Sequence, residues 1–316
     1  MISVKIIKKY HETDDIVVLE FADVNNIALP KFFPGAHIDV HIRPGLVRQY
    51  SLCNSSWERN RYVIAVLKEP RSRGGSIALH EQLDVGDVIS IGVPRNNFPL
   101  VSGRRYLLFA GGIGVTPIIC MADELNKAGA DFEMHYCTRS RIHTAFLERL
   151  LLGDYRERVY NYFDDSEFEW KDEFINLLAR PDLGTHLYVC GPKGFIDFIC
   201  AAAVENQWDD SNIHLEYFAA AKVGASPDQE FSVKIASTGQ IIEVRSDETL
   251  VSALRRNNIK IDTLCEHGVC GSCIIGVLAG VPEHRDTVLT KAEKEKNDQL
   301  TPCCSRSITN ELILDL

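Results

Sequence analysis

The sequence predicts a protein of several domains: an antiparallel β-barrel or sandwich, then a doubly wound α/β domain, then a small α+β module. Three observations predict this order. Short alternating runs fill residues 3–100, strand-like and helix-like segments alternate over 105–219, and half of the ten cysteines fall after position 264. A chain of 316 residues is also long enough for more than one hydrophobic core.

The first part alternates apolar and polar side chains, as half-buried strands do. The predicted strands cover residues 4–10, 15–21, 36–42, 61–67 and 87–93. Turn residues separate them, for example "DVGD" at 84–87. Strands this short and regularly spaced indicate an antiparallel barrel or sandwich.

In the second part, the pattern changes to alternating strand-like and helix-like segments. A buried strand at 105–112 runs into glycines, an amphipathic helix follows at 116–129, and the next strand covers 131–139. The alternation continues through 145–153, 159–165, 174–181, 185–192, 193–207 and 213–219. Such alternation of strand and helix predicts a doubly wound parallel sheet.

The third part begins after 221–230, which mixes small residues with Gly and Pro and is typical of a linker. Residues 231–245 predict a hairpin and 248–258 a short helix. A cysteine-rich loop and an apolar C-terminal segment follow, which together indicate a small α+β module.

Composition excludes several function classes. The formal net charge is -10 and no basic run offsets it, which argues against a general binder of nucleic acid or anionic membranes. No uninterrupted apolar stretch is long enough to span a bilayer, and residues 1–15 lack the apolar core of a signal peptide. We therefore expect a cytoplasmic protein. Five scattered cysteines read as buried small hydrophobes, namely Cys53, Cys120, Cys137, Cys190 and Cys200.

The loop "DTLCEHGVCGSCIIG" at 262–276 places Cys265, Cys270 and Cys273 four and then two residues apart. This spacing with a distant fourth cysteine is that of plant-type [2Fe–2S] proteins. Glycines in the loop let backbone N–H groups approach the cluster. The alternatives are a structural zinc site, which usually pairs two Cys-x-x-Cys elements, and plain core cysteines. Cys303 and Cys304 compete for the fourth position.

Two histidines near these cysteines are alternative candidate ligands. A Rieske centre needs two histidines with two cysteines, so His267 reads as an exposed loop residue and His284 as a local hydrogen-bonding residue. The acidic run at 164–173 is most simply a solvated surface, although such a patch can also steer partners.

The stretch "FAGGIGVTPII" joins a strand to a helix through glycines, a context that can hold a diphosphate at the helix N-terminus. Pro117 stands where a third glycine is usual, and Thr138, Arg139 and Ser140 replace the acidic residue that often ends the next strand. A mere tight turn is the alternative. The stretch "YVCGP" at 188–192 ends a later strand at the same expected sheet edge, which favours a ligand site.

A third candidate site ends a strand of the first part, in "VRQYSLCN" at 47–54. Arg48 suits a phosphate, Tyr50 an aromatic ring and Ser51 a ring edge. The loop "SRGGS" at 72–76 adds backbone amides for phosphate. Singly, such residues are most often ordinary surface residues. Together they favour a flavin, because a nicotinamide gives two electrons as hydride whereas an iron–sulfur cluster takes one.

These motifs identify a resemblance. The chain resembles the phthalate dioxygenase reductase family, which includes the vanillate demethylase reductases, within the ferredoxin–NADP reductase superfamily. The resemblance covers essentially the whole chain through "RQYSLCN", "RGGS", "PRNNFPL", "AGGIGVTPI", "YVCGPKGFID", "CEHGVCGSC" and "PCCSR", in the family's order. It implies an antiparallel β-barrel FMN domain at 1–102, an α/β NADH domain at 103–223 and a β-grasp plant-type ferredoxin domain at 229–316.

The resemblance also implies the site residues. FMN would be held by Arg48, Tyr50, Ser51, Leu52, Gly74, Gly75 and Ser76, and the pyrophosphate turn formed by Gly112, Gly114, Thr116 and Pro117. NADH would further meet Thr138, Arg139, Cys190, Gly191 and Pro192, with Phe218 over the flavin face and Cys190 beside the nicotinamide as the catalytic positions. The cluster ligands would be Cys265, Cys270, Cys273 and Cys303. Asn54 favours FMN over FAD, whereas Arg139 and Arg141 leave NADPH open.

The implied activity is that of an NADH-dependent oxidoreductase. Electrons would pass from NADH through FMN and the [2Fe–2S] cluster to a separate Rieske-type oxygenase, with the reductase itself a monomer. Two rivals remain: a stand-alone NADH:acceptor reductase of flavin or ferric iron, and a zinc-binding redox-sensing module.

Overall fold

The chain divides into two compact units, Met1–Glu216 and Tyr217–Leu316, and each has its own hydrophobic core. This architecture comes from a computed structural model, which describes residues 1–69, 74–166, 170–218, 229–263, 268 and 271–316. Within these ranges, none of the helices has the length and apolar character needed to cross a membrane.

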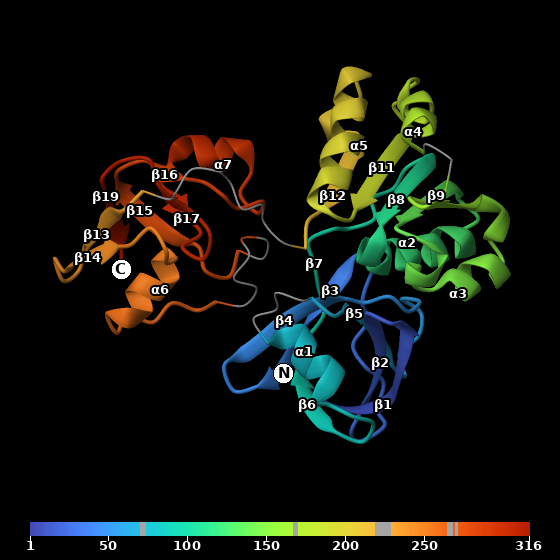
Figure 1. Cartoon of the computed structure of the whole chain (residues 1–316), viewed down its shortest axis with the longest axis horizontal. Helices are drawn as coiled ribbons and strands as arrows, with labels where there is room; N and C mark the ends of the chain where they lie inside the picture. Colours follow the sequence, from blue (N-terminus) through green and yellow to red (C-terminus); the bar gives the residue numbers. More distant parts are fainter. Residues whose placement is uncertain (70–73, 167–169, 219–228, 264–267, 269–270) are drawn as a thin grey trace. The chain divides into compact units, whose positions relative to one another are not determined.

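A seven-stranded antiparallel sheet forms the first part of the first unit (Figure 1). Its strands pair in the order β4–β3–β6–β1–β2–β5, with β7 beside β3. Their bounds are β1 Ile2–Thr13, β2 Ile16–Asp23, β3 Ala36–Arg43, β4 Leu46–Ser51, β5 Tyr62–Leu67, β6 Val88–Ile91 and β7 Arg95–Asn96. The five alternating runs of the sequence form β1, β2, β3, β5 and β6, so these predicted strands are confirmed.

The sheet closes into a barrel just beyond its two edge strands. Cys53, which follows β4, donates its backbone N–H to Val63 O of β5 at 2.9 Å. The Asn54 side chain accepts from Val63 N at 2.9 Å and donates to Arg61 O at 3.2 Å. Helix α1 (Gly75–Glu81) contributes the buried Ala78 and Leu79 to the barrel core. The predicted barrel is therefore confirmed.

The second part of the first unit is a parallel sheet in the order β10–β9–β8–β11–β12 (Figure 1). Its strands are β8 Arg105–Gly111, β9 Asp131–Thr138, β10 Val159–Phe163, β11 Thr185–Cys190 and β12 Ile213–Glu216. Its helices are α2 Val115–Lys127, α3 Leu147–Leu152, α4 Trp170–Leu178 and α5 Lys193–Glu205.

Successive residues of β8 show that helices cover both faces of this sheet. Leu108 lies in one core with Ile118 of α2. Its neighbour Phe109 contacts Phe174 of α4, with ring centroids 4.8 Å apart. Since successive side chains of a strand point to opposite faces, α2 and α4 lie on opposite sides, which confirms the doubly wound prediction.

The two parts of the first unit share apolar core. Val18 and Val63 of the barrel belong to the same buried cluster as Ile118 and Met121 of α2. This continuous packing explains why the two sheets form a single compact unit. The domain boundary expected at residues 102 and 103 remains a prediction.

The second unit contains a mixed five-stranded sheet in the order β14–β13–β19–β15–β17. The strands are β13 Phe231–Ile235, β14 Ile241–Val244, β15 Ile275–Ala279, β17 Gln299–Leu300 and β19 Glu311–Asp315, and a separate pair is formed by β16 Pro282–Glu283 and β18 Arg306–Ser307. Helix α6 (Leu250–Arg256) packs on the sheet, and α7 (Lys291–Lys296) precedes β17. The predicted hairpin, helix and α+β class are confirmed, whereas residues 221–228 of the expected linker at 221–230 lie outside the described ranges.

Candidate functional site

The end of β4 carries the first group of predicted residues. The Arg48 guanidinium donates to Val47 O at 2.7 Å, and its aliphatic stem lies against Gly75, where an added Cβ would stand 2.5 Å from Arg48 Cγ. Ser51 and Leu52 are buried, with Leu52 inside the barrel core. The structure thus brings a cation of β4 directly against the start of α1.

Tyr50 and the segment 74–76 complete this group. Tyr50 packs at the margin of the barrel core, and burial raises the pKa of its phenol. Gly74 adopts φ +90° at the N-cap of α1, a conformation that favours glycine. The Ser76 hydroxyl accepts from Glu69 N at 3.2 Å. Ser72 and Arg73 of the predicted "SRGGS" loop lie outside the described residues.

A guanidinium, a left-handed glycine and the first turn of a helix therefore meet at one edge of the barrel. This donor set fits a phosphate group, and the adjoining aromatic side chain of Tyr50 fits a ring system. The residues present fit a flavin at this edge.

The glycine turn joins β8 to α2. Residues Gly112–Gly114 form a single 3₁₀ turn, and Gly112 adopts φ +52°. A Cβ on Gly114 would stand 2.2 Å from Cys190 O and 2.6 Å from Gly191 N. Only glycine allows the turn to touch the end of β11, so the two motifs that the sequence placed at one sheet edge are in contact.

The remaining two residues of the motif, Thr116 and Pro117, lie in the first turn of α2. Thr116 is buried and donates its hydroxyl to Ile113 O at 3.1 Å. Pro117 is buried in the first helical turn, where a missing N–H costs no helical hydrogen bond. A glycine turn that leads into a helix N-terminus is a context that can hold a diphosphate.

The end of β11 forms the wall beside the glycine turn. Cys190 is fully buried, and burial raises the pKa of its thiol well above the ordinary value, so the side chain is a neutral apolar surface. A Cβ on Gly191 would stand 2.9 Å from Gly111 Cα. Pro192 follows as the N-cap of α5. These three residues bring β8 and β11 into close contact at their carboxyl ends, where ligands of such sheets bind.

Glu216 lies beside Cys190 and was not among the predicted residues. The parallel register of β11 and β12 pairs Cys190 with Glu216. Its Oε2 atom is buried and has no hydrogen-bond partner among the described residues. Burial raises the pKa of this carboxyl to about 8. The signal in the sequence was an acidic residue in "LEYFA", at the end of a strand that neighbours "YVCGP".

The residues after β9 differ in accessibility. The Thr138 hydroxyl is buried, 2.7 Å from Thr144 Oγ1 and 3.3 Å from Ser140 O. Arg139 and Arg141 are exposed. Phe218, which belongs to the second unit, is 37 % exposed. The roles expected for Thr138, Arg139 and Phe218 remain predictions.

Two of the four predicted cluster ligands are described. Cys273 and Cys303 are 4 % and 5 % exposed and pack together with Val251. Cys304 packs against this group. Cys265 and Cys270 lie outside the described residues, as does His267. Accordingly, the described residues alone contain no set of three His, Cys, Asp or Glu side chains suited to a metal ion.

Cys304 occupies a different position from Cys303. Its sulfur lies 3.2 Å from Thr301 Oγ1, and a Cβ on Gly268 would stand 2.4 Å from it. Cys304 therefore lies against Gly268 and has a hydroxyl partner, which favours Cys303 as the fourth ligand. Gly268 and Gly271 both adopt φ +71°, a conformation that favours glycine. The residues present fit a [2Fe–2S] cluster.

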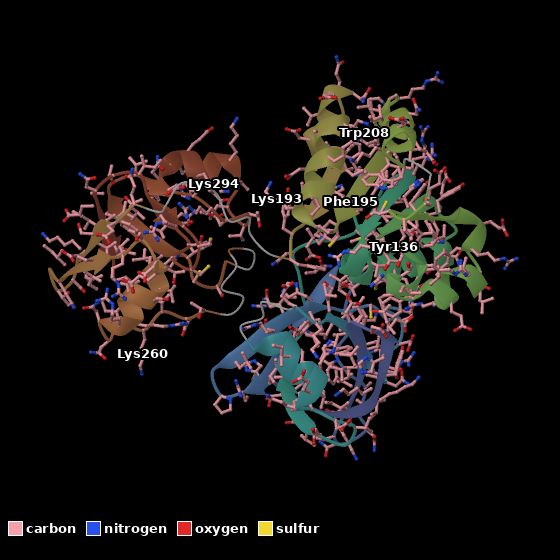
Figure 2. All side chains as sticks on the ribbon, viewed as in Figure 1. Tyr136, Lys193, Phe195, Trp208, Lys260 and Lys294 are labelled. Carbon is pink, nitrogen blue, oxygen red and sulfur yellow. The ribbon has the colours of Figure 1, made fainter. Side chains whose placement is uncertain are left out.

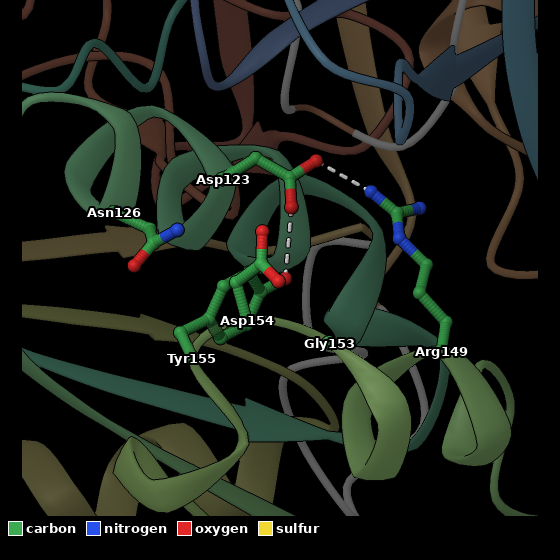
Figure 3. A pocket seen from close by; sticks show the side chains of 6 residues that line it. All are labelled: Asp123, Asn126, Arg149, Gly153, Asp154 and Tyr155. Atoms are coloured by element: carbon green, nitrogen blue, oxygen red, sulfur yellow. Dashed lines mark hydrogen bonds and ion pairs between the residues drawn. The ribbon is translucent and has the colours of Figure 1, made fainter.

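A polar cavity of about 260 Å³ lies away from these groups, beside the second half of α2 (Figure 3). Asp123 accepts from Arg149 at 2.5 Å and from the Tyr155 hydroxyl at 2.8 Å. Arg149 also donates to Cys53 O at 3.0 Å. Burial raises the pKa of Asp123, and both hydrogen bonds oppose that rise. These bonds join the barrel to α2 and α3, so this cavity has a structural explanation.

Both the cysteine module and the whole chain are similar to known proteins. A family model described as a 2Fe-2S iron-sulfur cluster binding domain matches residues 233–307. The chain is 49% identical to a vanillate O-demethylase oxidoreductase of Pseudomonas putida, over 100% of both chains. It is 41% identical to the reductase subunit of a tert-butanol monooxygenase / tert-amyl alcohol desaturase of Aquincola tertiaricarbonis, over 94% of this chain and 90% of the relative.

A solved structure is similar over almost the whole length. It is that of a phthalate dioxygenase reductase, described as a modular structure for electron transfer from pyridine nucleotides to [2Fe-2S]. It has a TM-score of 0.78 and 35% identity, and the match covers 99% of this chain and 97% of that one. The barrel, the parallel sheet and the cysteine module therefore occur together, in this order, in a characterised fold.

Proposed function

Because the chain belongs to the family of vanillate O-demethylase oxidoreductases and phthalate dioxygenase reductases, we propose a complete electron route for it. Electrons enter as hydride from NADH, pass through FMN and a [2Fe–2S] cluster, and leave to a separate Rieske-type oxygenase. The observation that carries the proposal is the packing of Cys273 against Cys303 inside the segment that matches the 2Fe–2S model. Such a pair provides an exit for electrons. The same chain carries the glycine turn Gly112–Gly114, the proposed nucleotide site, which we call the nucleotide turn.

The flavin site of the proposal is the edge of the barrel at β4 and α1. A bound flavin supplies the exchange between a two-electron hydride donor and one-electron steps, which a [2Fe–2S] cluster requires. Arg48 provides the charge for its phosphate, and Gly74 and Gly75 let the backbone approach. Tyr50 offers a ring face and Ser51 a hydroxyl for the ring edge.

The nicotinamide site of the proposal is the edge where β8, β11 and β12 end. Gly112 and Gly114 present backbone amides to the pyrophosphate, and the buried Cys190 thiol forms an apolar wall for the ring. Glu216, beside Cys190, adds a carboxyl that burial keeps protonated near neutral pH. A protonated carboxyl can donate a hydrogen bond without placing a negative charge beside the diphosphate.

The choice of FMN and NADH rests on separate residues. Asn54, the position that the family resemblance ties to FMN, uses both ends of its amide to join β4 to β5. It therefore belongs to the barrel wall. Arg139 is exposed after β9, where a guanidinium can also meet a 2′-phosphate. We propose NADH as the donor, and the ratio of kcat/KM for NADH and NADPH measures the preference.

The partner of the proposal is an oxygenase whose own substrate never enters this chain. The two relatives named above serve systems for vanillate and for tert-butanol. Reductases this similar therefore occur with chemically different substrates, and the docking of the oxygenase is what this chain must recognise. We propose that the reductase acts as a monomer.

The test combines the purified full chain with a Rieske-type oxygenase encoded beside it. We expect flavin and iron in the purified protein, and steady NADH-dependent substrate oxidation only when both proteins are present. Fast reduction of free flavin or ferric iron without any oxygenase turnover would favour the stand-alone reductase. A colourless protein that contains zinc would instead favour the redox-sensing module and overturn the proposal.

A further inference from the structure

The segment 286–288 lies directly against the cysteine loop. A Cβ on Gly268 would stand 3.1 Å from Asp286 Cα and 3.2 Å from Asp286 Cβ. Thr287 donates its backbone N–H to Gly268 O at 2.9 Å. A Cβ on Gly271 would stand 3.3 Å from Val288 Cγ2. Both glycines that flank Cys270 in the sequence therefore rest on this segment.

Asp286 places a carboxylate at this contact. Its side chain is 0% exposed, and Oδ2 accepts from Leu289 N at 2.8 Å. The cation that faces it is Lys294, whose Nζ lies 3.6 Å from Oδ2 and also donates to Asp286 O at 2.6 Å. Lys294 extends from α7 in the second unit (Figure 2). A buried carboxylate is thus held in place by one ammonium group and one backbone amide.

The other polar group beside this pair is His284, predicted from the sequence as a local hydrogen-bonding residue. Its Nδ1 lies 3.7 Å from Asp286 Oδ1, too far for a hydrogen bond. Both of its ring nitrogens and Asp286 Oδ1 are buried without a hydrogen-bond partner among the described residues. Arg285, between them, pairs with Glu283. Among the described residues, Lys294 is the ammonium group within ion-pair distance of Asp286, and the His284 imidazole lies at a similar distance from its other oxygen.

Reduction adds one negative charge to an iron–sulfur cluster, and nearby charges shift its midpoint potential. A fixed carboxylate behind the loop disfavours that added charge, whereas an ammonium favours it. The Asp286 side chain is 0 % exposed and that of Lys294 is 29 % exposed, so screening is weaker at the carboxylate than at the surface. The two members of this ion pair consequently influence reduction in opposite directions.

We propose that Asp286 and Lys294 are positioning residues that set the midpoint potential of the cluster, with Asp286 lowering it and Lys294 raising it. This inference rests on the proposed function, because it requires the [2Fe–2S] cluster. It goes beyond that function by assigning the control of the potential to an ion pair in the segment beneath the ligand loop.

The experiment measures the midpoint potential of the full-length protein by a redox titration followed by the cluster's electron spin resonance signal. Asp286→Asn keeps the shape of the side chain and removes its charge, and Lys294→Met removes the facing ammonium. We expect Asp286→Asn to favour reduction about tenfold, or about 59 mV for one electron, and Lys294→Met to oppose it by a similar factor. All variants are titrated at the same pH and ionic strength, so that only the substituted charge differs between them.

Opposite signs distinguish a charge effect from a loosened loop. Loosening would lower the iron content of both variants and would not send their potentials in opposite directions. Lys296→Met is the matched control, because Lys296 is an exposed lysine on the same helix, and its potential should equal that of the wild type. If Asp286→Asn does not retain the cluster, the sign of the Lys294→Met shift decides.

Two failures are distinguishable. A wild-type protein without an iron–sulfur signal would overturn the proposed function. A normal signal with unshifted potentials in both variants, or with shifts of the same sign, would overturn only the role of the ion pair.

Discussion

The two units use glycine for close approach in different ways. Gly114 of the first unit has a helical φ of -60°, and what excludes a side chain there is contact with Cys190 O. Gly268 of the second unit has φ +71° and also lies against the sulfur of Cys304. Gly114 is therefore required for space alone, whereas Gly268 is required for space and for backbone conformation.

The difference reflects what surrounds each motif. The nucleotide turn lies between β8, β11 and α2, in a large core that the barrel shares. The cysteine loop belongs to a smaller unit whose sheet and α6 supply a separate core. Packing alone orders the first site, whereas the second is expected to gain much of its order from metal ligation. Changes at the cysteine loop should therefore have the larger effects.

The largest expected effect is that of Cys273→Ser. Cys273 is buried against Cys303, and loss of one thiolate should prevent stable assembly of the cluster. Cytochrome c reduction by NADH should fall by about a hundredfold or more, since even outer partners of metal sites cost up to that factor. Ferricyanide reduction through the flavin should persist.

The matched control for this prediction is Cys200→Ser, a cysteine of α5 in the first unit, which should leave iron content unchanged. Equal loss of both reductase activities in Cys273→Ser would show that the two units do not function separately. Full retention of iron would remove Cys273 from the ligand set.

Gly268→Ala should have the next largest effect. The left-handed φ costs a non-glycine residue about 1–2 kcal/mol, and the contact with Cys304 adds about 1–3 kcal/mol of overpacking. We expect reduced iron content and a lower unfolding temperature for the cysteine module, with the flavin absorbance unchanged. Gly239→Ala provides the control, because Gly239 has φ +72° but open space around its Cβ. If both variants are affected equally, the contact with Cys304 contributes nothing.

Gly114→Ala tests the other side of the comparison. Overpacking against Cys190 O should destabilise the first unit by about 1–3 kcal/mol and raise KM for NADH, while the cluster potential stays constant. Gly194→Ala, on α5, is the control, because nothing lies within 4 Å of its Cβ and its φ is not left-handed. Alanine there should be neutral or stabilise by about 1 kcal/mol. An unchanged KM in Gly114→Ala would show that this turn does not contribute to nucleotide binding.

Much of the fold follows from local sequence. Alternation at 15–21 predicted β2, and the amphipathic run at 116–129 predicted α2, because each pattern presents one apolar face. Helix α1 was not predicted. Its first residues, Gly75 and Ser76, are typical of a turn, and only packing of Ala78 and Leu79 into the barrel makes the segment helical. Tertiary contacts, which local sequence does not show, therefore determine that α1 is helical.

The sites divide in the same way. Spacing was enough to select Cys273 and to limit the fourth ligand to Cys303 or Cys304, because plant-type clusters use cysteines at a fixed spacing along the chain. Glu216 and Asp286 could not be found by spacing. The first gains its place from the neighbouring strand that ends in Cys190, and the second from a segment that packs under a loop.

The smallest predicted effect concerns Glu216, which differs from Asp286 in its partners. Asp286 faces Lys294, whereas the described residues provide no ion pair for Glu216, and burial raises its pKa from 4.5 to about 8. The folded state therefore holds a proton that the unfolded chain releases above pH 4.5. The contribution of Glu216 to stability is then highest below that pH and is lost as pH rises toward about 8. Glu216→Gln should flatten this fall, because an amide does not titrate. Urea unfolding at several pH values measures it, and an unchanged slope would mean that Glu216 is ionised in the folded protein.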